Sequence, residues 1–526
     1  MSSREKGLGK MTIKLIMLVV FFAIMIGVGF YCRRHATDVN GFVLGGRSVG
    51  PWLTAFAYGT TYFSAVIFVG FAGQFGWKFG ISATWIGIGN AVLGSLLAWV
   101  VLGRRTRLMT HHFESSTMPE FFGARLDSTA LKIVASLIVF IFLIPYTASL
   151  YNGLSRLFGM AFNIDYTVCI IIMAVLTGVY VIAGGYMATA INDFIQGIIM
   201  LVDIVAVIFA VLQTNGGFMG SLDALSKVSD ASVSSSPGIF ASFFGPNPLA
   251  LFGVILLTSL GTWGLPQMVQ KFYSIKSEKD IKKGAIISTI FAIIIAGGCY
   301  FMGGFGRLFT TGDVVKANGF DSIIPSMLSN YSPVLVGLIV ILVLSASMST
   351  LSALVMASSS TLTLDFIKPL FAKEMSDKRQ LLSIRLLIVV FIFISVIIAI
   401  LQYKATVAFI AQLMGISWGA LAGSFLAPFL YSLYWKRTTK VAVFVNFAFG
   451  SGVMILNLLF GLLKIDFFPT ILLSPINCGA FTMLAGFIIV PVISLLTKAP
   501  DKKMVDDAFA CYDTTVVVTA KHALSD

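Results

Sequence analysis

The stretch PWLTAFAYGTTYFSAVIFVGFAG, residues 51–73, is long and apolar enough to cross a bilayer, yet polar residues interrupt it near its middle. Crossing a hydrocarbon core of roughly 30 Å takes about 20 predominantly apolar residues in a helix. Gly59 is followed at once by Thr60, Thr61 and Tyr62, which a helix facing lipid does not need. This combination predicts a membrane helix that is broken near its centre.

A second interrupted run, TSLGTWGLPQ at residues 258–267, places Gly261, Gly264 and Pro266 close together. Counting apolar runs along the chain puts it in the seventh span and residues 51–73 in the second, five spans apart. Interrupted helices in corresponding positions of two halves are the best sequence indication of a transporter site between inverted repeats. Because Gly and Pro are also common in ordinary membrane helices, the matched spacing carries more weight than either break alone.

The composition extends the membrane assignment to the whole chain. Its 526 residues are 57% hydrophobic and only 11% charged, with a mean hydropathy of +0.94, whereas soluble domains have about 25% charged residues. The apolar runs are continuous rather than alternating, which predicts helices and not barrel strands. We therefore predict an all-α polytopic membrane protein with about thirteen spans, near residues 13–31, 51–76, 82–103, 131–155, 166–186, 192–213, 247–268, 284–308, 333–363, 384–403, 406–434, 441–463 and 474–497.

Lysine and arginine are concentrated in alternate loops, and such loops are usually cytoplasmic. This set includes Arg104, Arg105, Arg107, Lys271, Lys276, Lys279, Lys282 and Lys283. The pattern predicts a multi-pass protein of the cell membrane with its N-terminus outside, one transporter domain over residues 1–500 and a cytoplasmic tail over 501–526. Basic residues before the first span oppose this orientation, but the other loops outweigh them. The net charge of +13 is then a topology signal and a contact with membrane lipid, not a nucleic-acid surface.

Five hydroxyl side chains gather in LSASMSTLS, residues 344–352, inside an otherwise apolar run. A broken helix leaves backbone carbonyls without intrahelical partners, and small hard cations prefer oxygen ligands. Ala346, Ser349 and Thr350 share one helix face because their spacing is i, i+3 and i+4. The hydroxyls could therefore serve a monovalent cation together with the carbonyls of the broken span. Alternatively, they bond the carbonyls of their own helix or allow close packing.

Asp193 is an acid next to an apolar run, in GGYMATAINDFIQG at residues 184–197. Acids inside membrane segments are functional candidates by default. The competing interpretation is a carboxylate at the start of a helix, where it complements the helix dipole.

Several segments together resemble the solute:sodium symporter family, over about residues 15–440. They are FVLGGRSVGPWLTAF (42–56), TTYFSA (60–65), TMPEFFGAR (117–125), GGYMATAINDFIQG (184–197), GLPQ (264–267) and SMSTLSALVMASSS (347–360). The resemblance implies the leucine-transporter fold, with inverted five-helix repeats at about 51–213 and 247–434. It also implies sodium-coupled import of a small solute by alternating access, with no enzymatic activity and a monomer sufficient for transport.

Carried over by position, the resemblance also implies ion ligands. The main sodium site would use the carbonyls of Thr60, Phe63 and Ala346 with the side chains of Ser349 and Thr350. A second sodium would use Asp193, Ser349 and Ser352. Ala353 stands where a further hydroxyl ligand is expected, which weakens the case for the second ion.

The solute implied is a small polar organic acid or amino acid. Proline-transporting members have an aspartate where this chain has Tyr62, and two tryptophans of their pocket are replaced by Val66 and Thr258. Tyr62 and Ser64 are more like the pantothenate and monocarboxylate branches. The pocket residues expected here are Tyr62, Ser64, Tyr146, Trp263 and Gln267.

Other functions remain open at this point. The same fold driven by protons would need a titrating carboxylate, for which Asp193 is the good candidate. A channel would need a ring of acids or a repeated filter, and a transporter-like sensor would need a signalling domain; neither pattern is visible in the sequence. A metal enzyme could use His111, His112 and Glu114, but adjacent histidines on a helix do not face one site.

Overall fold

The computed structural model describes residues 3–33, 37–162, 164–234, 236–329, 331–405, 410–465 and 467–513, which form helices joined by turns. Ten helical segments are long and apolar enough to cross a membrane, or eleven if the bent pair Pro248–Gly264 and Pro266–Ser274 counts as one more. The all-α polytopic class is therefore confirmed. The number thirteen stays a prediction, because Val66–His112 and Tyr166–Gln213 are 47 and 48 residues long, more than one crossing needs.

The α-helices of the first half are α1 (Ser3–Cys32), α2 (Val39–Leu44), α3 (Pro51–Tyr62), α4 (Ala72–Phe79), α5 (Thr84–Gly89), α6 (Arg104–His112), α7 (Met118–Arg125), α8 (Thr129–Phe162), α9 (Tyr166–Gln213) and α10 (Gly217–Ser226). Those of the second half are α11 (Pro248–Leu260), α12 (Pro266–Ser274), α13 (Glu278–Ala292), α14 (Gly298–Gly303), α15 (Gly312–Asn318), α16 (Ile323–Leu328), α17 (Pro333–Thr361), α18 (Lys368–Phe371), α19 (Asp377–Ala405), α20 (Ile410–Tyr434), α21 (Lys440–Leu463), α22 (Pro475–Leu496) and α23 (Lys502–Ala510).

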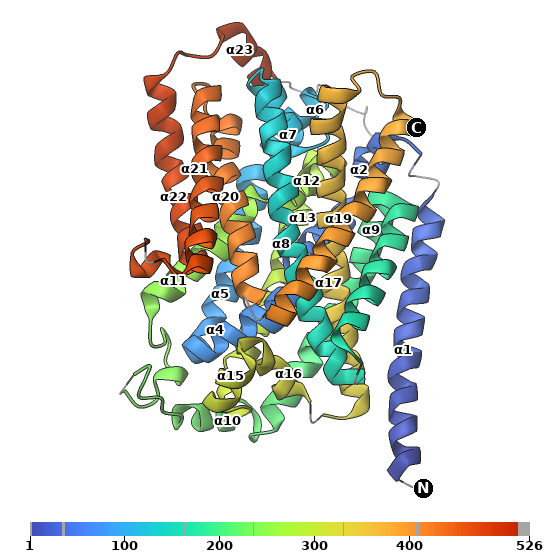
Figure 1. Ribbon diagram of the computed structural model, residues 1–526, viewed down its shortest axis with the longest axis vertical. Helices are drawn as coiled ribbons and strands as arrows, with labels where there is room; N and C mark the ends of the chain where they lie inside the picture. Colours follow the sequence, from blue (N-terminus) through green and yellow to red (C-terminus); the bar gives the residue numbers. More distant parts are fainter. Residues whose placement is uncertain are drawn as a thin grey trace, which may run out of the picture.

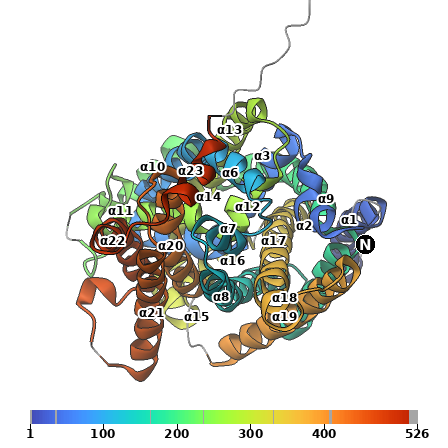
Figure 2. The same cartoon turned by 90° about the horizontal axis from the view of Figure 1, so that it is seen from above.

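The long helices run along the vertical axis of Figure 1, with α6, α7 and α23 at one end and α10, α15 and α16 at the other. Helix α1 begins at the end that holds α10, so the two ends of the described chain lie at opposite ends of the molecule. Seen from above (Figure 2), α1 lies on one flank, beside α9. The opposite flank is formed by α20, α21 and α22. Residues 514–526 of the predicted tail lie outside the described residues, and the absolute orientation stays a prediction.

The predicted break in residues 51–73 is present. Helix α3 ends at Tyr62, Phe63 has extended backbone angles (φ −106°, ψ 101°), and a π-helical segment follows at Val66–Phe71. Gly59 sits one turn before the break because α13 packs closely there: a Cβ atom on Gly59 would lie 2.5 Å from Cδ1 of Phe291. The second span is thus two short helical pieces joined by a few non-helical residues.

The second predicted break, in residues 258–267, is also present. Helix α11 passes into a short 3₁₀ turn at Gly261–Gly264, Leu265 is extended (φ −87°, ψ 120°), and α12 starts at Pro266 with a 49° bend. Proline is suited to the first position of a helix because its fixed φ matches and its missing N–H is not needed there. The break therefore falls where Gly264 and Pro266 predict it.

Helix α9 turns sharply at Gly185, whose φ of 59° and ψ of −153° are available to glycine and costly for other residues. A Cβ atom at Gly185 would lie 2.9 Å from the carbonyl oxygen of Phe42. Asp193 lies two turns beyond this kink, in the helical part that continues to Gln213. It is therefore not the helix-start carboxylate of the competing interpretation.

Candidate functional site

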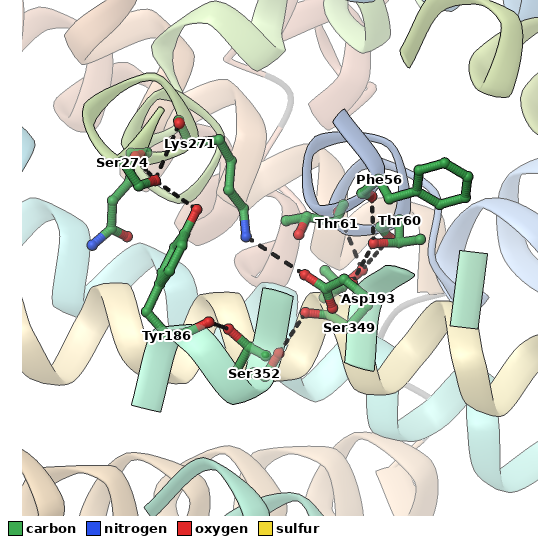
Figure 3. Close-up of polar contacts among 12 residues, drawn as sticks. Phe56, Thr60, Thr61, Tyr186, Asp193, Lys271, Ser274, Ser349 and Ser352 are labelled. Atoms are coloured by element: carbon green, nitrogen blue, oxygen red, sulfur yellow. Dashed lines mark hydrogen bonds and ion pairs between the residues drawn. The ribbon is translucent and has the colours of Figure 1, made fainter. Parts of the chain in front are cut away.

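Hydroxyls of α17 face the broken end of α3. The Ser349 hydroxyl donates to the Thr60 hydroxyl at 2.7 Å. Thr350 Oγ1 lies 3.1 Å from the carbonyl oxygen of Thr61 and 3.4 Å from that of Thr60. Figure 3 shows Ser349, Thr60 and Thr61 meeting between the two helices. All four residues are buried, so this is an interior cluster of oxygen atoms.

The carbonyls in this cluster are exposed to a ligand because α3 stops. The last carbonyls of a helix have no intrahelical N–H partner, and α3 ends only two residues after Thr60. Thr350 also donates to the Ala346 carbonyl at 3.0 Å. Ala346, Phe63 and Ser64 line a small cavity directly beside the break. The structure thus brings together the residues expected to bind sodium, and their neutral oxygens fit a small hard cation.

Two other hydroxyls of residues 344–352 have a different role. Ser347 donates to the Val343 carbonyl at 2.6 Å, and Ser352 donates to the Ser349 carbonyl at 2.8 Å. Both contacts are bonds to the backbone of their own helix, the behaviour expected from the competing interpretation. Ser349 and Thr350 alone of these four reach across to α3.

The carboxylate of Asp193 is buried beside this cluster, with a side chain 1% exposed. The Lys271 ammonium lies 3.8 Å from Asp193 Oδ2 and 5.2 Å from the centre of the Tyr186 ring. The sequence pattern placed Lys271 in a basic cytoplasmic loop, and this is wrong: it lies in α12 and is 2% exposed. The reason is that the bend at Leu265 lets the chain continue as a buried helix. The available signal was a lone charge in PQMVQKFYS, directly after the break.

Tyr62 and Tyr146, two of the expected pocket residues, meet at Trp418 of α20. The ring of Tyr62 stacks on Phe63 at 4.4 Å between centroids and lies 6.2 Å from Trp418. The ring of Tyr146 meets Trp418 edge-on at 5.9 Å. The Tyr62 hydroxyl donates to the carbonyl of Thr258 on α11, which ties the two broken spans together. Sequence reasoning missed Trp418, although a tryptophan among the small residues of ISWGALAG was a visible signal.

The remaining expected pocket residues are Ser64, Trp263 and Gln267. All three are buried, but they do not all belong to this aromatic cluster. Ser64 lies in the break itself and accepts the Val66 N–H at 3.3 Å. Trp263 directs its indole N–H to the carbonyl of Leu93 at 3.0 Å. Within the described residues, Oε1 of Gln267 has no hydrogen-bond partner. Buried polar groups normally have one, so this oxygen is available to a polar ligand.

Known families, proteins and structures resemble this chain over most of its length. Residues 42–450 match the sodium:solute symporter family. The chain is 28% identical over 497 residues to the osmoregulated proline transporter OpuE of Bacillus subtilis (strain 168), covering 93% of this chain and 96% of that protein. It is 31% identical over 498 residues to a sodium/proline symporter of Staphylococcus aureus (strain JH9), covering 92% and 93%. Among solved structures, the substrate-bound outward-open state of a Na⁺-coupled sialic acid symporter matches with a TM-score of 0.68 and 16% identity, over 93% of this chain and 99% of that one, which shows a shared fold.

Proposed function

The chain belongs to the sodium:solute symporter family, and from this premise we propose how it couples the two cargoes. It is a membrane transporter and not an enzyme, and it imports a small organic solute together with Na⁺. One observation carries the proposal. The Thr350 hydroxyl reaches from α17 to the open carbonyls of the broken span, and the Ser349 hydroxyl donates to the Thr60 hydroxyl beside them.

The proposed sodium ligands are the carbonyls of Thr60, Phe63 and Ala346 and the hydroxyls of Ser349 and Thr350. The hydrogen bonds between these residues support the assignment, because they show that several of these oxygen atoms already lie close together. A bound cation would take the place of these hydrogen bonds. Sodium bound here holds the end of α3 against α17. Low cytoplasmic sodium then releases the ion after the site opens inward.

The proposed solute pocket adjoins this ion, with Tyr62, Ser64, Tyr146, Trp263 and Gln267 as its lining, and Trp418 now added to them. Tyr62 and Ser64 lie within four residues of Thr60, so the ion and the solute organise the same few backbone residues. Each then raises the affinity for the other by the same factor, as linkage requires. The proposed class is a small amino acid or organic acid; proline belongs in the screen because of the relatives named above, although Tyr62 replaces the aspartate expected for proline.

We also propose how the chain is organised in the membrane. The inverted repeats are placed at about 51–213 and 247–434 within a single transporter domain of residues 1–500, and a monomer suffices for transport. The N-terminus is outside and the 501–526 tail cytoplasmic. The family resemblance also implies a second sodium at Asp193, Ser349 and Ser352. Whether an ion binds there depends on Lys271, whose ammonium lies 3.8 Å from Asp193 Oδ2.

The test is a thermal-shift screen of the purified protein against amino acids, organic acids and sugars, in sodium and in choline buffer. A true solute raises the melting midpoint in sodium and much less in choline. Uptake of that solute into proteoliposomes must then follow an imposed sodium gradient and persist when a protonophore removes any pH gradient. Uptake that follows the pH gradient instead would establish the proton-driven alternative, for which Asp193 is the candidate titrating group.

A further inference from the structure

We propose that the Lys271 ammonium acts as a tethered cation at the Asp193 carboxylate, so that the protein itself fills the second cation position and only one Na⁺ is bound. The inference rests on the proposed sodium-coupled function, and it assigns a role to a residue that the sodium ligand set does not include. It concerns the number of ions bound, not the identity of the solute.

The first support is the burial of both charges. The side chains of Lys271 and Asp193 are 3% and 1% exposed, and their charged atoms are 3.8 Å apart. A buried charge is costly unless another charge or hydrogen bonds compensate it. Within the described residues the Ser349 hydroxyl lies beside Asp193, but the group of opposite charge in contact with the carboxylate is Lys271. The lysine is therefore the group that compensates this acid.

The second support is that the lysine is held in place. Its ammonium lies over the Tyr186 ring at 5.2 Å, a favourable arrangement for a cation. That ring is fixed in turn, because its hydroxyl accepts a 2.7 Å hydrogen bond from Ser274, which is on the same short helix as Lys271. Figure 3 shows Lys271 extending from α12 towards Asp193, with Tyr186 beside it. The cation therefore has a built position and does not reach Asp193 by chance.

The third support is the position of the pair beside the sodium ligands. Ser349, which contacts Thr60, lies next to Asp193. A free Na⁺ bound by Asp193 would sit a few ångströms from the ammonium, and two like charges at that distance repel each other strongly in the low dielectric of the interior. Lys271 thus excludes a second ion while it leaves the neutral oxygen cluster at Thr60 and Thr350 free for the first.

The experiment counts bound sodium ions directly, so that it does not depend on knowing the solute. Equilibrium binding of ²²Na⁺ is measured on the purified full chain for wild type, Lys271→Ala and Lys271→Arg. We expect one ion and a Hill coefficient near one for wild type and Lys271→Arg. For Lys271→Ala we expect two ions and a Hill coefficient well above one. Adding Asp193→Asn to Lys271→Ala returns the count to one.

Two ions bound by wild type would overturn the inference without any variant. One ion bound by Lys271→Ala, with unchanged affinity, would overturn it as well. If Lys271→Ala does not purify as a monodisperse protein, Lys271→Met, which keeps the length of the side chain, takes its place. Failure of the sodium-site proposal looks different: wild type binds no ion while Lys271→Ala binds one. No ion in either protein would reject both ideas.

Discussion

Replacing Thr350 with valine removes one hydroxyl and keeps the shape of the side chain. In the structure this hydroxyl lies 3.1 Å from the Thr61 carbonyl and 3.0 Å from that of Ala346, and we propose it as a direct sodium ligand. A hydrogen bond to a charged group contributes about 1.5–3 kcal/mol, and we take this as the scale for one ligand of the ion. Since about 1.4 kcal/mol corresponds to a factor of ten, sodium affinity should fall roughly 10- to 150-fold.

The assay is the sodium-dependent stabilisation of the purified protein against thermal unfolding. At a sodium concentration 100 times the wild-type Kd, binding stabilises the folded state by about 2.7 kcal/mol. A variant with a Kd 100-fold higher gains only about 0.4 kcal/mol at that concentration from the same relation. In choline, where no sodium binds, Thr350→Val and wild type should melt at similar temperatures.

The chain offers a matched control three residues away. Ser347 donates only to the Val343 carbonyl of its own helix, so Ser347→Ala should leave the sodium dependence unchanged. Thr350→Ser keeps the hydroxyl and should retain most of the affinity. The reasoning fails if Thr350→Val and Ser349→Ala both keep the wild-type sodium affinity while folding normally.

Three further outcomes are expected. Gly185→Ala should destabilise the protein by about 1–3 kcal/mol from backbone strain, and by more because the added Cβ atom would lie 2.9 Å from the Phe42 carbonyl oxygen; Gly452→Ala, which meets nothing within 4 Å, is the control in thermal melts. Tyr62→Phe removes the hydroxyl that joins the two broken spans and should weaken solute binding several-fold, measured as solute-dependent stabilisation in sodium; equal affinity would remove Tyr62 from the pocket. Burial lowers the pKa of Arg125 to about 10, so its guanidinium is still charged at pH 7 and donates to the Ser432 carbonyl at 3.1 Å. Arg125→Gln should therefore lower the free energy of unfolding by about 1.5–3 kcal/mol, and an unchanged denaturation midpoint would contradict this.

Local features were predictable because they depend on a few neighbouring residues. Gly59 with Thr60, and Gly264 with Pro266, mark the two breaks where the structure has them. The i, i+3, i+4 spacing places Ser349 and Thr350 towards one neighbour, and that neighbour is α3. The same reasoning left the number of spans open, since π-helical and kinked segments join pieces that hydropathy counts separately.

Contacts between distant segments were not predictable in this way. The lysine at 271 was assigned to a loop from its charge alone, and only the fold shows that α12 carries it into the interior to face Asp193. Trp418 joins Tyr62 and Tyr146 across more than 270 residues of sequence. Hydropathy and helical periodicity in a single sequence do not indicate which distant side chains will contact one another.

Hydropathy, backbone freedom and helical periodicity act over short distances, so the membrane class, the two broken helices and the hydroxyl face of residues 344–352 follow from the residues alone. Which hydroxyls face the broken span, and which acid has a buried cationic partner, are known only once the helices are packed. Those outcomes depend on packing between α3, α9, α12 and α17. In the low-dielectric interior the interaction between charges depends strongly on their distance. A shift of a few ångströms in Lys271 would therefore decide whether the Asp193 carboxylate is compensated by the protein or left to bind an ion.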